Sequence, residues 1–184
     1  MIDENSIISM NLGKAEMSLI RRMARAAEVG GKSHIRKGSD RSDNLSIDQL
    51  VGQIGTYAGC KYLQGDIKDY RISRYYANKA PTVGDGGADV TGSNIDFKAS
   101  AVRNSSKPLT TYKLLVRPRE LHDSWVYILV LVSDITDKSA TAHLIGWADT
   151  RMLPDNPEND GIFKGAYMLN AEDLNPLPPL RWWF

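Results

Sequence analysis

Several features that define large protein classes are scarce or missing from this chain. It contains a single cysteine, Cys60, and three histidines. One thiol cannot form an internal disulfide, and the histidines have neither H-x-x-x-H spacing nor cysteine partners. We therefore expect no disulfide framework and no zinc site. The motif G-x-x-x-x-G-K-[ST] is also absent, so we expect no nucleotide cofactor held by a phosphate-binding loop.

Long hydrophobic runs are missing as well. The longest, "WVYILVLV" at 125–132, is far shorter than the roughly 20 residues that cross a bilayer as a helix, and it predicts a buried strand. No charged segment followed by an apolar run stands at the N-terminus, so no signal peptide is visible. These features, with the single thiol, favour a cytoplasmic protein that does not bind membranes.

The net charge is only +1, but the charges are unevenly distributed. Residues 21–41 hold seven lysines and arginines against two acidic residues. A second basic set comprises Lys98, Arg103, Lys107, Lys113, Arg117 and Arg119. Segregated charge permits a phosphate-binding side on a nearly neutral protein, and the alternative is an ordinary solvated surface.

Hydrophobic periodicity predicts two helices followed by strands. The first helix is expected over about 14–28 and to end at Gly30-Gly31, and a polar connector follows it. The second helix is expected over 46–63, capped by Asn44 or Ser46. Its glycines at 52, 55 and 59 indicate close packing against a sheet, since each lowers helix propensity by roughly 1 kcal/mol. Strands are predicted at 69–77, 87–91, 94–100, 111–117, 125–132 and 141–148. The fold class is α+β, a mixed central sheet flanked by helices.

The stretch "DGGADVTGSNIDFKAS" (85–100) concentrates chemistry on a predicted hairpin. Alternate residues of a strand share a face, so Asp96 and Lys98 should point the same way, with Phe97 turned to the opposite layer. The turn at 91–94 should bring Asp89 across from them. Two neighbouring carboxylates raise each other's pKa unless a cation neutralises them, and hard oxygen ligands suit Mg²⁺, with Mn²⁺ as a substitute. The alternative is a surface Asp–Lys pair of little energetic weight.

With these residues the sequence resembles the PD-(D/E)xK nuclease superfamily, which includes restriction endonucleases, Holliday-junction resolvases and many phage nucleases. Asp89 matches the first acidic position, and Asp96-Phe97-Lys98 matches the (D/E)xK element. The helix "GQIGTYAGCKYL" and the strands at 125–132 and 142–149 resemble the family's core, so the resemblance covers roughly 46–176. It implies a restriction endonuclease-like core in a single nuclease domain. That domain, 1–184, comprises a basic helix and connector (1–45), the αβ core (46–167) and a Pro/aromatic tail (168–184).

The resemblance implies a Mg²⁺-dependent DNA endonuclease that hydrolyses phosphodiester bonds, in the phage case within the host cytoplasm. Asp89, Asp96 and the backbone carbonyl of Phe97 would bind the metal, and Lys98 would position the attacking water. The DNA backbone would be held by basic residues, namely Arg36, Lys37, Arg41, Arg103 and Lys107.

The chain departs from the family pattern on the first core helix. Many members carry a glutamate there, and this sequence has Gln53 and Thr56, with Asp48 a turn or more earlier. Gln53 is assigned to the catalytic set because its amide oxygen can bind a metal or its water, and Thr56 is the other candidate. The missing charge favours one metal over two. The proline of the family name is replaced by Ala88.

The missing glutamate also motivates an alternative function, a non-catalytic DNA-binding or assembly protein on a nuclease-like fold. No sequence-reading module is evident, so structure-selective and nonspecific cleavage both remain open. A junction resolvase would need two active sites and hence a homodimer, to which the apolar tail "PLPPLRWWF" could contribute.

Overall fold

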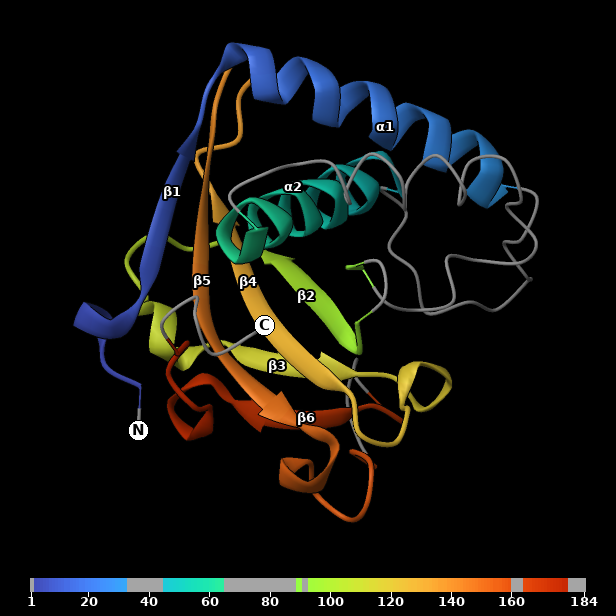
Figure 1. The fold of residues 1–184 in the computed structure, drawn as a ribbon, viewed down its shortest axis with the longest axis vertical. Coiled ribbons are helices and arrows are strands. Elements are labelled where there is room, and N and C mark those ends of the chain that lie inside the picture. Colours follow the sequence, from blue (N-terminus) through green and yellow to red (C-terminus); the bar gives the residue numbers. More distant parts are fainter. Residues whose placement is uncertain (1, 33–44, 65–88, 91–92, 160–163, 179–184) are drawn as a thin grey trace.

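The computed structural model describes residues 2–32, 45–64, 89–90, 93–159 and 164–178. Within these residues the protein is of mixed α+β type, with two α-helices, a four-stranded mixed sheet and a separate two-stranded sheet (Figure 1). The helices are α1 (Lys14–Lys32) and α2 (Leu45–Gln64). The strands are β1 (Ile8–Leu12), β2 (Ile95–Ala101), β3 (Lys113–Val116), β4 (Val126–Ser133), β5 (Ala140–Asp149) and β6 (Tyr167–Asn170). Neither described helix has the length and apolar character needed to cross a membrane.

The four-stranded sheet has the order β1-β5-β4-β2. Strand β2 runs parallel to β4, and the other neighbouring strands are antiparallel. The central strand β4 is apolar along nearly its whole length because both of its faces are covered. In the described part of the chain β2 pairs only with β4, so its opposite edge is free of strand pairing.

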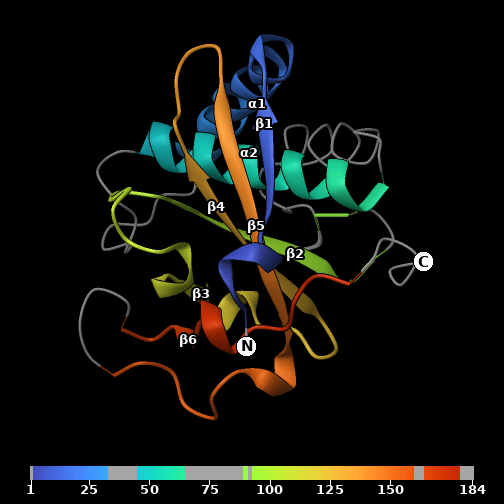
Figure 2. The same cartoon turned by 90° about the vertical axis from the view of Figure 1, so that its left-hand side faces the viewer.

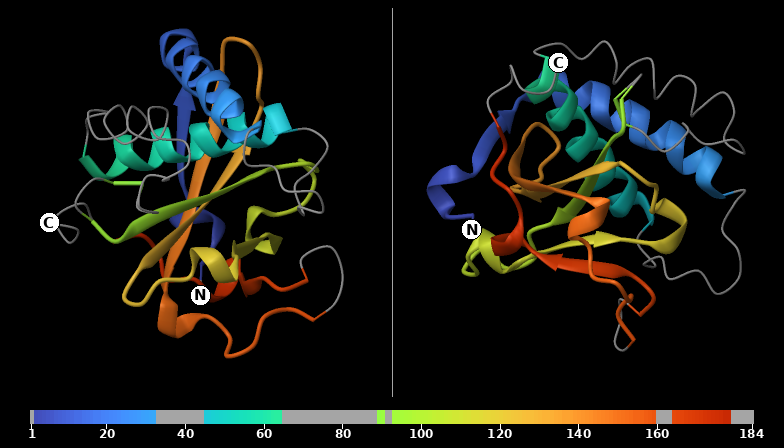
Figure 3. Two further views of the ribbon diagram at one scale, coloured as in Figure 1. Left: turned by 90° about the vertical axis from the view of Figure 1, so that its right-hand side faces the viewer. Right: turned by 60° about the horizontal axis from the view of Figure 1, so that its bottom comes forward.

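The two faces of this sheet carry different layers. On one face α2 packs across the strands and α1 packs on α2, enclosing a core that includes Ile54, Ile128 and Val130 (Figures 1 and 2). On the other face lies the β3–β6 sheet, which encloses a second core around Leu114, Leu129 and Leu131 (Figure 3). Alternation along β4 sends successive residues to the two cores. The predicted flanking helices therefore occupy one face, and a small sheet covers the other.

The glycines of α2 explain how closely the helix approaches β2. A Cβ atom on Gly55 would lie 2.5 Å from the Cβ of Ala99, and one on Gly59 would overlap the ring of Phe97. The predicted close packing is thus present at these two positions. It is absent at Gly52, where an added Cβ would meet no atom within 4 Å.

Some predicted boundaries are wrong. Helix α1 continues through Gly30-Gly31 to Lys32, since glycine lowers helix propensity without forbidding helical geometry. Ser46 lies inside α2 and is not its cap, because the helix begins at Leu45. Strand β1 was not predicted. Asn44, the strand predicted at 69–77 and the final residues of the tail lie outside the described residues.

The predicted strand at 87–91 is also wrong where it can be examined. Asp89 and Val90 form a bend, and the remaining residues of that segment lie outside the described part of the chain. The bend arises because the turn into β2 already begins at Val90, whose carbonyl accepts hydrogen bonds from the backbone N–H and hydroxyl of Ser93.

Candidate active site

Three of the polar residues singled out from the sequence, Asp89, Asp96 and Lys98, lie at the first residues of β2. Asp96 and Lys98 project from the same face of the strand, and the Oδ2 atom of Asp96 lies 2.6 Å from the Nζ atom of Lys98. Phe97 projects from the opposite face into the core beneath α2. The period-two alternation thus has the predicted outcome, with two charged side chains on one face and an apolar anchor on the other.

Asp89 lies along the edge of β2 that faces away from β4. Its backbone N–H donates to the carbonyl of Ile95 at 2.9 Å, and its Oδ2 accepts from the backbone N–H of Phe97 at 2.9 Å. Its Oδ1 accepts a hydrogen bond of 3.2 Å from the hydroxyl of Thr56 on α2. In a strand the N–H and C=O of one residue point to the same edge, so the carbonyl of Phe97 also faces this edge.

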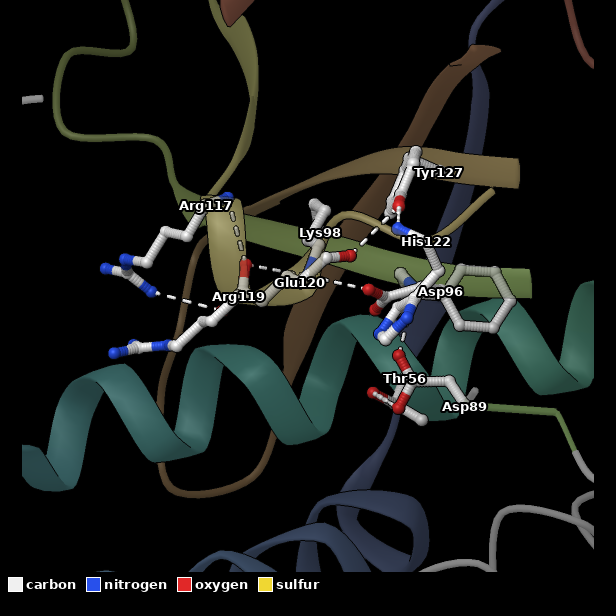
Figure 4. Close-up of polar contacts among 10 residues, drawn as sticks. Thr56, Asp89, Asp96, Lys98, Arg117, Arg119, Glu120, His122 and Tyr127 are labelled. Atoms are coloured by element: carbon white, nitrogen blue, oxygen red, sulfur yellow. Dashed lines mark hydrogen bonds and ion pairs between the residues drawn. The ribbon is translucent and has the colours of Figure 1, made fainter. Parts of the chain in front are cut away.

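Asp96 forms an ion pair with Lys98 (Figure 4), yet its carboxylate is in an unfavourable electrostatic environment. Its pKa is raised to about 7, mainly because burial disfavours the charged form and also because Asp89 and Glu120 are negatively charged, while Lys98 opposes the rise. The repulsion from Asp89 means that the two carboxylates are close enough to sense one another. A divalent cation shared by the two would relieve this repulsion.

Glu120 is a member of this cluster that the sequence did not reveal. It ends the short helical turn η3 (Pro118–Glu120), and its Oε2 lies 2.9 Å from the Nζ atom of Lys98. Burial alone would lower the pKa of Lys98, but the charges of Asp96 and Glu120 outweigh burial and raise it. Burial likewise favours a higher pKa for Glu120, and the charge of Lys98 reverses this, so the Glu120 pKa is lowered. One ammonium is therefore shared between two carboxylates.

On α2, both candidates for the missing glutamate are buried. Gln53 and Thr56 are 4% and 3% exposed. Thr56 is the residue whose hydroxyl contacts Asp89, and Gln53 lies one turn earlier on the same helix. Asp48 lies in the first turn of α2, more than one turn further from Thr56.

The predicted phosphate-binding residues are not all brought to the cluster. Arg103 and Lys107 are exposed and follow the far end of β2. At about 3.3 Å per residue, Arg103 lies roughly 20 Å along the chain from Asp96. Arg36, Lys37 and Arg41 lie outside the described residues. Two other arginines lie nearer the site, since Arg117 and Arg119 approach the Oε1 atom of Glu120 at 3.5 Å and 3.9 Å.

The donor set limits the kind of metal site that the cluster can form. Within the described residues, no three His, Cys, Asp or Glu side chains gather to hold a metal ion. A cation at this site would have two carboxylates, Asp89 and Asp96, with a backbone carbonyl and water completing its shell. Such an all-oxygen set fits Mg²⁺ or Mn²⁺, which commonly keep several waters.

Comparison of the chain with known proteins found no matching family model, no matching characterised protein and no matching solved structure.

Proposed function

We propose that the chain is a metal-dependent DNA endonuclease with a restriction endonuclease-like core. The observation that carries the proposal is the convergence of Asp89, Asp96 and Lys98 at the start of β2, with Asp96 at a pKa of about 7 because burial and Asp89 disfavour its charge. The spacing of these residues in the sequence is the one that resembles the PD-(D/E)xK superfamily. A helix preceding them and a mixed sheet containing them are compatible with that core.

Asp89, Asp96 and the carbonyl of Phe97 would hold the metal at the edge of β2 that faces away from β4. A Mg²⁺ ion bound there supplies positive charge that polarises a phosphodiester and lowers the pKa of a bound water. The hydrogen bonds from Thr56 and from the N–H of Phe97 keep the Asp89 carboxylate in place before any cation binds. This preorganisation reduces the entropy lost on binding.

Lys98 would supply a positive charge beside the reacting phosphate. Its Nζ atom lies at the side chain of Asp96, so an ammonium at this position can donate to the attacking water and to a phosphate oxygen. Its raised pKa keeps it protonated at neutral pH, so its role is to orient and to stabilise charge. Arg117 and Arg119 would extend the positive surface toward the neighbouring phosphates.

The structural observation that favours the rival, a non-catalytic DNA-binding or assembly protein, is the state of Asp89. Both of its carboxylate oxygens already accept hydrogen bonds from the protein, which suits a purely structural residue that closes the edge of β2. The two functions differ in their dependence on metal. DNA binding without cleavage, unchanged by Mg²⁺ removal, would favour the rival.

The test is cleavage of plasmid and branched DNA with Mg²⁺ and with EDTA. Wild type is expected to cut only with the metal, and Asp96→Asn and Lys98→Ala are each expected to lose at least about 100-fold in rate. Matched controls are Asp155→Asn and Lys138→Ala, which remove the same groups from exposed positions and should cut as wild type does. The proposal fails if wild type never cuts, or if both site variants cut as fast as it does.

A further inference from the structure

Lys98 has two carboxylate partners in this structure, and the proposed function requires one of them for another purpose. Its Nζ atom is 2.6 Å from Asp96 and 2.9 Å from Glu120. A cation bound by Asp96 would draw that carboxylate toward itself and repel the ammonium. The side chain of Lys98 is a flexible four-carbon stem, and its ammonium would then be free to leave the site unless another group held it.

Glu120 is built to be that group, because the protein fixes both its backbone and its carboxylate. The hydroxyl of Tyr127 donates to the Glu120 carbonyl at 2.9 Å, and the Glu120 N–H donates to the carbonyl of Arg117 at 2.8 Å. The N–H of Arg117 in turn donates to Oε2 of Glu120 at 3.3 Å. Tyr127 is fully buried on β4, where it is the strand partner of Asp96. Glu120 is thus held by a residue of β4 that is paired with Asp96 on β2, which fixes its position relative to the site (Figure 4).

We infer that Glu120 is the positioning residue for Lys98, holding its ammonium beside the reacting phosphate while Asp96 binds the metal. The inference rests on the proposed function for the identity of the reaction, but the contact itself is independent of it. Lys98 contacts two carboxylates, those of Asp96 and Glu120, and its Nζ atom lies 5.9 Å from the centre of the Tyr127 ring on β4. Asp89, the other carboxylate of the cluster, would be held by the same cation as Asp96, so Glu120 is the carboxylate that can hold Lys98 once Asp96 is engaged.

The first test follows Lys98 itself, without metal or DNA. In the Asp96→Asn variant, residue 96 has no charge with which to hold Lys98, as would be the case when a cation engages the Asp96 carboxylate. In that protein the ¹⁵N-labelled ammonium of Lys98, assigned by its loss in Lys98→Met, should give a protected NMR signal. Adding Glu120→Gln should abolish the signal through exchange with water, and adding Glu120→Asp should restore part of it. Glu158→Gln, at an exposed glutamate, should change nothing.

A Lys98 signal of equal intensity with and without the Glu120→Gln change, in folded proteins, overturns the inference. If the double variant does not fold, the same comparison is made between Asp96→Ser and Asp96→Ser/Glu120→Gln, which also leave Lys98 without the charge of Asp96. An unchanged Lys98 signal there also overturns the inference.

The second test uses cleavage kinetics and separates failure of the inference from failure of the proposed function. Glu120→Gln should lower kcat by roughly tenfold or more and change KM little, with partial recovery in Glu120→Asp, because positioning acts on the reacting state. If wild type is active and the Glu120→Gln variant is equally active, the positioning role of Glu120 is refuted and the proposed nuclease function is not. Wild type that never cuts refutes the nuclease, while the NMR result still decides whether Glu120 holds Lys98.

Discussion

On one face of β2, Phe97 lies against α2 so tightly that Gly59 has no room for a side chain. On the other face, Asp96 and Lys98 form an ion pair, and the pKa of Asp96 is nevertheless raised to about 7. The first face follows the rule for stable cores, in which apolar groups interlock without polar atoms. The second face departs from it, since a carboxylate with a pKa of about 7 is held beside two others. A strand that is well packed on one side and electrostatically strained on the other is what the proposed function requires, since the second side would then serve chemistry.

The packed face should respond to a single added methyl group. Gly59→Ala places a Cβ within the ring of Phe97, so it should lower the free energy of unfolding by about 2 kcal/mol even though alanine favours helix. Gly52→Ala is the matched control on the same helix. It meets no atom within 4 Å, and the propensity gain should stabilise the protein by up to about 1 kcal/mol. Denaturant unfolding measures both, and equal effects would contradict the close approach of α2 to β2.

On the charged face, stability should depend on pH. Because the folded-state pKa of Asp96 is raised from 3.8 to about 7, the folded protein retains a proton in this window that the unfolded chain has lost. The free energy of unfolding should therefore fall as the pH rises from about 4 to about 7, and a shift of about three pKa units sets an upper limit of about 4 kcal/mol on this change.

The Asp96→Asn variant provides the comparison for this pH dependence. It should lose that part of the slope and become relatively more stable than wild type above pH 7. Glu120, whose pKa is lowered, contributes in the opposite sense, since its stabilisation is lost only as the solution becomes more acidic than its ordinary range near 4.5. Identical slopes in wild type and variant would show that Asp96 is not electrostatically strained.

Local sequence patterns were sufficient to predict much of the difference between the two faces of β2. The alternation of "NIDFKAS" predicted which side chains share a face of β2, and the spaced glycines of α2 predicted a close helix–sheet contact that is present at Gly55 and Gly59. Strand β1 was missed although its sequence, "ISMNL", alternates between apolar and polar residues. The strand gains its stability from pairing with β5, more than a hundred residues later, and no local feature reports that pairing.

Glu120 could not have been found in the same way. It lies 22 residues after Lys98 on a single helical turn. The segment "RPRE" around it shows only a cluster of charged residues, with no periodicity or motif that predicts a contact with Lys98. Its place beside Lys98 depends on the path of the chain from β3 to β4 and on the buried hydroxyl of Tyr127. Conversely, the prediction that Arg103 joins the phosphate surface depends on its closeness to Lys98 in sequence, yet an extended strand separates the two along the chain.

The most direct test of the central claim, that Asp89 and Asp96 together form a cation site, is calorimetric titration of Mn²⁺ into the metal-free protein near pH 8, where Asp96 is ionised. Wild type should bind one Mn²⁺ per chain. Asp89→Asn and Asp96→Asn should each weaken binding by at least about tenfold, since each removes one of two charged ligands, and the exposed control Asp155→Asn should bind as wild type does. Absence of binding by wild type, or an affinity in the two site variants equal to that of wild type, would contradict the account.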